Sequence, residues 1–272
     1  MNGTPLKLGI AGLGAIGLAV ARKIDRSAVP GMVLSAVAVR DRAKAAAKLA
    51  DVGSKPQLVS LPELAEHADV VLECIPGAHF AEVARPAIER GRIFMPLSVG
   101  QLLDHMDLVD RAKATGARII VPTGALAGLD AIRAIAEGGV ESIRIRTRKP
   151  PKGLEGAPYL RTHGISLQGL KAPLRIFEGS AREAIRGFPA NVNVAVALSL
   201  AGIGPDRTRI ELWADPAVTR NTHTIEAVSD SSNLTVTIEN IPSEENPATG
   251  KVTALSALAA LRRLTAPLVV GT

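Results

Sequence analysis

Short apolar runs alternate with amphipathic, helix-like patterns over the first 121 residues of the chain. The runs that predict strands lie near residues 8–11, 33–39, 69–75, 93–99 and 118–121, and the helical patterns lie near 18–24, 42–49, 80–89 and 102–114. Continuous apolar strands separated by helices are typical of a parallel sheet that helices cover on both faces. We therefore predict an α/β domain with a doubly wound parallel sheet.

The pattern changes after Pro122. Strand-like segments lie at 142–147, 209–214, 222–228 and 234–239, with a hairpin turn at 230–233 and helical patterns at 129–136 and 194–201. Several strands with few helices predict a second, α+β domain on a mixed or antiparallel sheet. A last helical pattern, at 251–264, has an apolar side that we expect to pack on the first domain. The expected domains are therefore 1–123 with 250–272, and 124–249.

A glycine pattern, Gly12-x-Gly14-x-x-Gly17, lies between the first strand and the first helix. This order is the context of the dinucleotide fingerprint, in which the three glycines permit a tight turn, close approach of a pyrophosphate and close helix–strand packing. We predict a Rossmann-type first domain in which Gly12, Gly14, Ala15, Ile16 and Gly17 contact the cofactor. The alternative is a glycine-rich turn that binds nothing.

Asp41 follows the second strand, 24 residues after Gly17. A carboxylate at this place accepts hydrogen bonds from the adenosine ribose hydroxyls. Arg40 and Arg42 flank it, and an arginine there tolerates a 2′-phosphate, so the sequence leaves NAD and NADP open. Alternatively, Asp41 caps the helix that begins at Arg42.

Composition excludes several other classes of protein. Aromatic residues make up only 2% of the chain, which argues against a stacking surface for single-stranded nucleic acid. Cys74 is the only cysteine, so the chain has no internal disulfide and no cysteine-based zinc site, and we expect no metal. No apolar run approaches the roughly 20 residues of a membrane span, and the first strand leaves no room for a secretory signal. We expect a cytoplasmic protein without membrane or nucleic-acid partners.

The positive charge of the chain is concentrated in one region. Residues 140–190 hold ten Lys and Arg against four Glu, an excess that equals the net charge of +6 of the whole chain. The region is either a site for a small polyanionic substrate, a nucleic-acid patch or an ordinary solvated face.

Three further positions carry candidate chemistry. His223 leads into a strand of the second domain, and an imidazole is suited to general acid–base catalysis because its pKa is close to working pH. Ala127 lies in a loop between a strand and a helix, where backbone groups can contact a nicotinamide. The alternative for Ala127 is a plain turn. Asn193 precedes an apolar helix and either presents its amide to a ligand or caps that helix.

Taken together, these segments resemble the L-aspartate dehydrogenase family over nearly the whole chain. The resemblance rests on GLGAIG at 12–17, VPTGALAGLDA at 121–131, TRKPP at 147–151, FPANVNVA at 188–195, and the segments 215–223 and 246–256. It implies a catalytic His223, cofactor contacts from Ala127 and Asn193, and NAD or NADP as hydride acceptor. The family's reaction is the reversible oxidation of L-aspartate to iminoaspartate, which water converts to oxaloacetate and ammonia.

The reaction that the resemblance implies needs partners for two substrate carboxylates. Planar arginine guanidinium groups suit carboxylates best, the basic region supplies arginine and lysine candidates, and Arg148 and Lys149 come first. The resemblance also suggests a homodimer and a role in NAD biosynthesis. The alternatives are a homoserine-dehydrogenase-like or dihydrodipicolinate-reductase-like enzyme, or a nicotinamide-sensing DNA-binding protein without turnover.

Overall fold

The computed structural model describes residues 4–246 and 249–272. The chain divides into two compact units, which are described one at a time. The first unit runs to Pro122 and includes Thr253–Val269, and the second comprises Thr123–Val252 and Val270–Thr272. Pro247 and Ala248, which belong to one segment of the family resemblance, lie outside the described residues. No helix among the described residues is long and apolar enough to cross a membrane.

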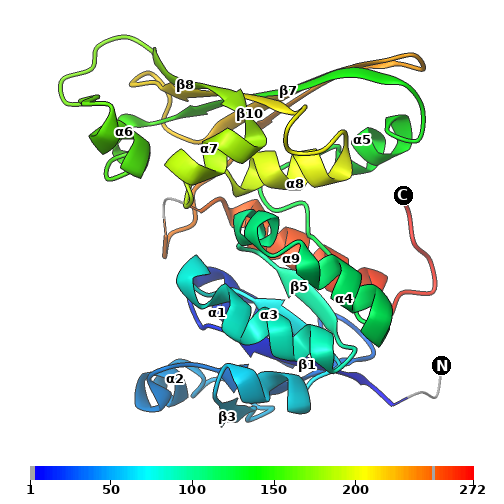
Figure 1. Cartoon of the computed structure of the whole chain (residues 1–272). Coiled ribbons are helices and arrows are strands. Elements are labelled where there is room, and N and C mark those ends of the chain that lie inside the picture. The colour runs from blue at the N-terminus through cyan, green and yellow to red at the C-terminus, as the bar shows by residue number, and fades with distance from the viewer. Residues whose placement is uncertain (1–3, 247–248) are drawn as a thin grey trace. The chain divides into compact units, whose positions relative to one another are not determined.

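The first unit is built on a six-stranded sheet in the order β3-β2-β1-β4-β5-β6, with every neighbouring pair parallel (Figure 1). The strands are β1 (Leu6–Ala11), β2 (Met32–Ala38), β3 (Gln57–Val59), β4 (Val70–Glu73), β5 (Ile93–Pro96) and β6 (Arg118–Ile119). The strand order reverses between β1 and β4, and in such sheets ligands bind beyond the carboxyl ends of the strands at this switch point. The predicted doubly wound α/β fold is confirmed.

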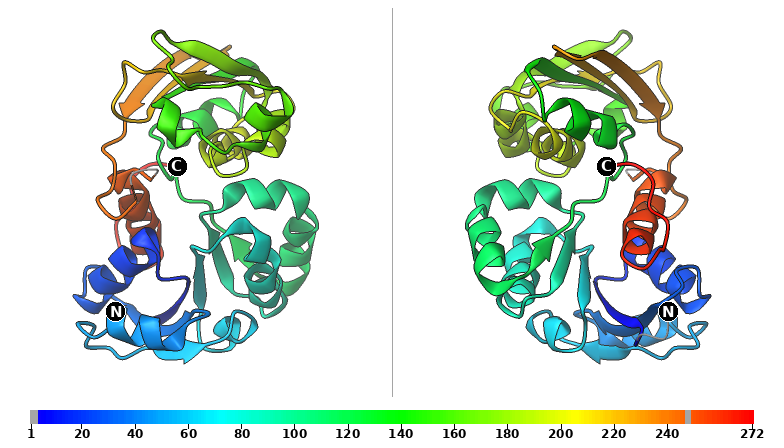
Figure 2. Two further views of the ribbon diagram at one scale, coloured as in Figure 1. Left: turned by 90° about the vertical axis from the view of Figure 1, so that its left-hand side faces the viewer. Right: turned by 90° about the vertical axis from the view of Figure 1, so that its right-hand side faces the viewer.

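Helices and 3₁₀ turns connect these strands. The helices are α1 (Ala15–Asp25), α2 (Arg42–Lys48), α3 (Phe80–Glu89) and α4 (Asp107–Thr115), and the 3₁₀ turns are η1 (Pro62–Glu66), η2 (Gly77–His79) and η3 (Val99–Asp104). The last helix, α9 (Lys251–Arg263), follows the second unit in the sequence. The single helix expected at 102–114 is wrong, because His105, at φ −131° and ψ 38°, interrupts it between η3 and α4. The strand β3 is too short, at three residues, to show in the hydrophobic pattern. In both views of Figure 2, α9 lies beside α1.

The second unit is built on a five-stranded mixed sheet in the order β11-β10-β7-β9-β8. Its strands are β7 (Val140–Lys149), β8 (Leu174–Ser180), β9 (Arg209–Ala214), β10 (Thr222–Ser229) and β11 (Asn233–Glu239), and only β7 and β9 pair in parallel. Its helices are α5 (Leu129–Ile135), α6 (Pro158–Thr162), α7 (Ala181–Gly187) and α8 (Asn193–Ala201), with a 3₁₀ turn η4 (Pro151–Gly153). Figure 1 shows α5, α7 and α8 along one face of the sheet. The predicted α+β domain with its 230–233 hairpin is confirmed.

The hydrophobic pattern of the sequence did not predict strand β8 or helix α7. An irregular register between Arg175 and Phe177 breaks the alternation of the edge strand β8. A capping box starts α7, in which Ser180 Oγ accepts a bond from the Glu183 N–H and the Glu183 carboxylate accepts one from the Ser180 N–H. The S-x-x-E spacing of this box was a readable signal for a helix start.

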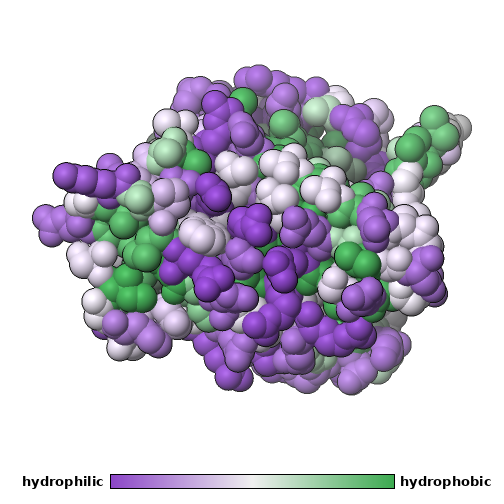
Figure 3. Space-filling view, turned by 90° about the horizontal axis from the view of Figure 1, so that it is seen from above, coloured by the Kyte–Doolittle hydropathy of each residue, from purple (hydrophilic) through white to green (hydrophobic). Residues whose placement is uncertain are grey.

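The side chains of the central strand β7 differ in chemistry between the two faces of the sheet. Ile143, Ile145, Thr147 and Lys149 are buried on the face that the helices cover, whereas Arg144, Arg146 and Arg148 alternate with them on the other face. Figure 3 looks onto this open face, where hydrophilic residues outnumber scattered hydrophobic ones. We call it the outer face of the mixed sheet, and the helix-covered side its inner face.

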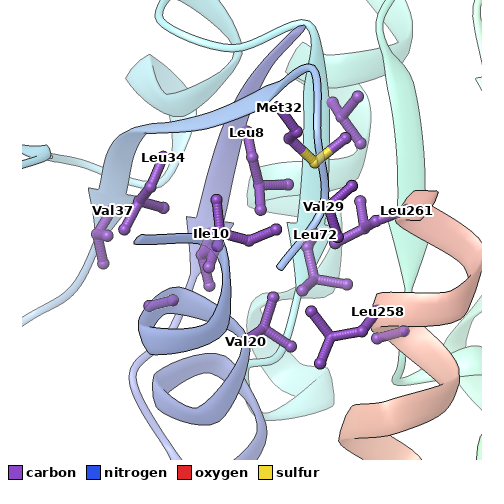
Figure 4. Close-up of a cluster of buried hydrophobic side chains, with 14 of the residues drawn as sticks. Leu8, Ile10, Val20, Val29, Met32, Leu34, Val37, Leu72, Leu258 and Leu261 are labelled. Carbon is purple, nitrogen blue, oxygen red and sulfur yellow. The ribbon is translucent and has the colours of Figure 1, made fainter. Parts of the chain in front are cut away.

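One core cluster of the first unit is built mainly from aliphatic side chains, in keeping with the shortage of aromatic residues, and the ring pair Phe80–Phe94 is also fully buried in this unit. Leu8, Ile10 and Leu72 come from the sheet, and Leu258 and Leu261 come from α9 (Figure 4). Full burial of one such leucine contributes about 1.5–3 kcal/mol. The last helix therefore belongs energetically to the first unit, although about 130 residues of the second unit separate it from the other elements in the sequence.

Candidate active site

The three fingerprint glycines of the loop after β1 occupy different environments. Gly12 has φ +92°, and a Cβ placed on it would lie 2.8 Å from the Cys74 carbonyl oxygen. A Cβ on Gly17 would lie 2.0 Å from the Gly12 carbonyl oxygen, so these two positions require glycine for the fold. Gly14 has no atom within 4 Å of its Cβ position. It therefore leaves open space next to the backbone, which is what a close-approaching pyrophosphate requires.

The start of α1 is suited to an anion. Gly14 is the N-cap without a side-chain cap, and the first bond of the helix runs from the Leu18 N–H to the Gly14 carbonyl. The N–H groups of Ala15 and Ile16 therefore have no acceptor within the helix. The first turn holds no acidic residue, and Lys48 Nζ donates to the Leu13 carbonyl at 2.7 Å, which adds positive charge at the loop. This loop fits the diphosphate of a dinucleotide.

Asp41 is the N-cap of α2. Its Oδ1 accepts a hydrogen bond from the Lys44 N–H at 2.9 Å, so the capping role considered from the sequence is present in the structure. The side chain is exposed, as are Arg40 and Arg42 beside it. The second carboxylate oxygen is left for a ribose hydroxyl, so capping and cofactor binding are compatible.

Glu73, at the end of β4, is a buried carboxylate near the glycine loop that the sequence pattern did not indicate. The carboxylate is fully buried and accepts bonds from the Ile75 N–H (2.8 Å), the Ser98 N–H (2.9 Å) and the Ser98 hydroxyl (3.1 Å). Burial raises the pKa of Glu73, against the effect of these bonds. The side chain ties together the segments that follow β4 and β5, beside the glycine loop. A carboxylate at the end of an otherwise apolar strand was the signal for it.

His223 lies on the inner face of the mixed sheet. It is the antiparallel partner of Thr147, with Thr147 Oγ1 3.0 Å from His223 Nδ1. The two side chains are 2% and 1% exposed, so the hydrogen bond is shielded from water. Burial, together with the positive charge of Lys149, lowers the pKa of His223 to about 3. The imidazole is therefore neutral near pH 7.

Lys149 is the cation that shares this face with His223. Its Nζ donates to the Asn191 carbonyl oxygen (3.0 Å) and to Asn191 Oδ1 (3.4 Å). Burial lowers the pKa of Lys149 to about 8. An ammonium group has three N–H donors, and the two acceptors of Asn191 leave one of them for a further acceptor. The group is thus a partly satisfied buried cation beside a neutral imidazole.

Arg148 lies on the outer face, so the structure does not bring it together with His223 and Lys149. Its guanidinium donates to Asp215 Oδ2 at 3.1 Å and lies 5.7 Å from the centre of the Trp213 ring. Arg144 and Arg146 of the same face pair with Glu211. Much of the basic excess found in the sequence is therefore neutralised by carboxylates within this unit, as expected for a solvated face.

Ala127 and Asn193, the remaining predicted cofactor contacts, lie in two different segments of the second unit. Ala127 is exposed in the loop before α5, and Asn240 Nδ2 at the end of β11 holds this loop by a 3.1 Å bond to the Ala125 carbonyl. Asn193 is the first residue of α8, whose N-cap is Val192, so the expected N-cap assignment for Asn193 is wrong by one position. Asn191, just before this helix, is the residue that contacts Lys149.

A glycine loop with the dinucleotide spacing on a doubly wound sheet, together with a second unit on a mixed sheet, is the arrangement of two-unit nicotinamide-dependent dehydrogenases, and the comparisons with known proteins agree with this class. No group of three or more potential metal ligands occurs in the part of the chain that the structure describes. A family model described as "Homoserine dehydrogenase, NAD binding domain" matches residues 12–122. Another, described as "Aspartate dehydrogenase, C-terminal", matches residues 130–264.

Individual relatives specify the family further. The chain is 53% identical to an L-aspartate dehydrogenase of Bradyrhizobium diazoefficiens, covering 98% of this chain and 94% of that protein. It is 52% identical to L-aspartate dehydrogenase 3 of Bordetella bronchiseptica, covering 98% of each. The crystal structure of aspartate dehydrogenase from Thermotoga maritima matches with a TM-score of 0.74 and 26% identity, over 98% of this chain and 99% of that one. The chain belongs to the L-aspartate dehydrogenase family and is an oxidoreductase with an NAD-binding unit, as the sequence resemblance implied.

Proposed function

We propose that this enzyme oxidises L-aspartate to iminoaspartate with NAD or NADP as hydride acceptor, and that it catalyses the reverse reductive amination. The α-carbon of aspartate loses a hydride and its amine loses a proton. Water then adds to the imine, which yields oxaloacetate and ammonia. The observation that carries the proposal is the buried, neutral His223 beside the buried Lys149 on the inner face of the mixed sheet.

The nicotinamide cofactor supplies the hydride acceptor when it is bound. We assign its diphosphate to the glycine loop and its adenosine ribose to Asp41, in keeping with the open space at Gly14 and the exposed carboxylate. Ala127 and Asn193 of the second unit are the proposed contacts nearer the nicotinamide. In this assignment, the first unit is the dinucleotide-binding domain and the second is the substrate domain.

Lys149 is the proposed partner of one substrate carboxylate. Its third N–H needs an acceptor, and a carboxylate is a strong, charge-assisted acceptor for a buried ammonium. Arg148 is the other candidate from the sequence, but its place on the outer face and its bond to Asp215 favour Lys149. A buried cation at this place also discriminates against substrates that bring no negative charge to it.

His223 is the proposed acid–base group. At a pKa of about 3, the imidazole of the empty site is neutral but a weak base. Burial is the main cause of this low pKa and the positive charge of Lys149 is the smaller one. A carboxylate bound at Lys149 offsets that charge, so the substrate raises the basicity of the ring by this part of the shift. In the proposed reaction, His223 accepts a proton from the amine and then a proton from the water that attacks the imine.

The test is a steady-state assay of reduced-cofactor absorbance with L-aspartate and with NAD or NADP. His223→Ala is expected to lower kcat by roughly 10²–10⁴ with cofactor affinity retained. Lys149→Met is expected to raise the KM for aspartate more than it lowers kcat, whereas Arg148→Met serves as the matched control with little effect. Near-normal turnover in His223→Ala refutes the acid–base assignment. Turnover with homoserine but none with aspartate refutes the assignment of L-aspartate as the substrate.

The homodimer and the role in NAD biosynthesis stay predictions of the family resemblance, and the cytoplasmic location stays a prediction of the sequence composition. Sedimentation of the purified protein tests the first of these. A sedimentation coefficient that corresponds to a 28.3 kDa particle at micromolar concentration contradicts the dimer.

A further inference from the structure

The hydroxyl of Thr147 contacts one particular nitrogen of the His223 ring. The distance from Thr147 Oγ1 to His223 Nδ1 is 3.0 Å, and both side chains are almost completely buried. Strand β7 lies between β10 and β9, so Thr147 is held from both sides in the sheet. Threonine is β-branched, and its side chain rotates less freely at χ1 than most others. The contact is therefore a fixed feature of the strand pair.

A neutral imidazole carries one N–H, and this contact bears on which nitrogen has it. If the Thr147 hydroxyl donates to Nδ1, then Nε2 carries the proton and has no lone pair for a base. If Nδ1–H donates to Thr147 Oγ1, Nε2 keeps its lone pair and is the atom that can exchange protons with a ligand. Both arrangements form the hydrogen bond between the two side chains, but only the second leaves a ring nitrogen with a free lone pair.

We infer that Thr147 is a positioning residue, whose Oγ1 accepts the bond from His223 Nδ1–H and thereby leaves Nε2 as the proton-exchanging atom. This inference rests on the acid–base role proposed for His223. The chemical type of the side chain at position 147 affects the protonation state of His223, in addition to the hydrogen bond. An aspartate in place of Thr147 would orient the ring equally well, but its charge would favour the imidazolium. A hydroxyl orients the ring and leaves it neutral, which suits a ring that already lies near the cation of Lys149.

Direct evidence comes from NMR of the ligand-free protein with ¹⁵N-labelled histidine, because the two ring nitrogens have different shifts in each tautomer. The expected result is the Nδ1–H tautomer for His223 in the wild-type protein and in Thr147→Ser. An Nε2–H ring in the wild-type protein overturns the inference. The result for the wild-type protein does not depend on turnover or on the folding of Thr147→Ser, so it decides the question by itself.

Kinetics provide the second measurement. Thr147→Val removes the hydroxyl at nearly constant volume, and we expect kcat to fall about fivefold to tenfold, as for the loss of one net hydrogen bond. The KM for cofactor is expected to stay unchanged, and Thr147→Ser is expected to restore kcat. The matched control is Thr224→Val, which removes a hydroxyl bond to Thr237 (3.1 Å) on the outer face of the same sheet. An unchanged kcat in Thr147→Val, or an equal fall in the control, overturns the inference.

Failure of this inference is distinguishable from failure of the proposed function. Near-normal turnover in His223→Ala refutes the acid–base role of His223, and the positioning role of Thr147 is then refuted as well. An inactive His223→Ala together with an Nε2–H ring in the wild-type protein refutes only the role of Thr147.

Discussion

Acidification is expected to destabilise the second unit through His223. Protonation of this ring is unfavourable in the folded protein, where burial and the charge of Lys149 lower its pKa to about 3. In the unfolded chain, the ring has the ordinary pKa of about 6.5. The unfolded state therefore binds a proton first as the pH falls. The stabilisation from a neutral His223 is present above pH 6.5 and is lost progressively between about pH 6.5 and pH 3.

The size of the effect follows from the two pKa values. Between pH 7 and pH 5, the free energy of unfolding is expected to fall by about 2 kcal/mol from this residue alone. Lys149 does not contribute in this window, because its pKa of about 8 keeps it protonated in the folded protein, as it is in the unfolded chain. Hydrogen bonds from Ser180 lower the pKa of Glu183. Carboxyl groups of this kind stabilise the folded protein while they are ionised, and this stabilisation is lost only at pH values below the usual pKa of a carboxyl group.

Urea unfolding at pH 7 and pH 5 measures this difference. Trp213 is the only tryptophan of the chain and lies in the second unit, so its fluorescence reports on that unit. His223→Asn is expected to lose most of the pH dependence, whatever its stability at pH 7. His163→Asn, which removes an exposed histidine of the same unit, is expected to keep it. Equal pH dependence in His223→Asn and the wild-type protein refutes the reasoning.

Four other variants test the first unit. Gly14→Val is expected to abolish cofactor binding in a titration and to leave the urea midpoint nearly unchanged, since its Cβ meets no atom within 4 Å. Gly17→Ala is expected to lower the midpoint as well, because its Cβ would clash with a backbone carbonyl at 2.0 Å; equal midpoints in the two variants contradict this division. Leu261→Ala, at a fully buried site, is expected to cost about 2–5 kcal/mol in stability, and a loss below 1 kcal/mol contradicts the packing of α9. Replacing Arg40 and Arg42 with Ala is expected to weaken NADP binding more than NAD binding, as isothermal titration checks, and equal losses argue against their contact with a 2′-phosphate.

Local patterns in the sequence were enough to predict most of the first unit. The alternation of apolar runs and helical patterns, together with the Gly12-x-Gly14-x-x-Gly17 spacing, is a short-range signal that needs no knowledge of distant contacts. The short strand β3 and the interrupted helix before α4 were the exceptions, since three residues or one changed backbone angle leave little trace in a pattern. Glu73 was missed because its hydrogen bonds come from segments that meet only at the sheet edge.

The second unit depends much more on tertiary structure. The sequence offered His223 as a candidate acid–base group and Arg148 and Lys149 as adjacent candidate cations, without a way to choose between the two cations. The pleat of β7 separates these neighbours, so Lys149 joins His223 on the buried face and Arg148 faces outward. Thr147 lies 76 residues from His223 and reaches it only through the register of β7 and β10. Residue types and short spacings therefore define the chemistry available to this protein, whereas strand pairing and burial decide which groups meet and in which protonation state.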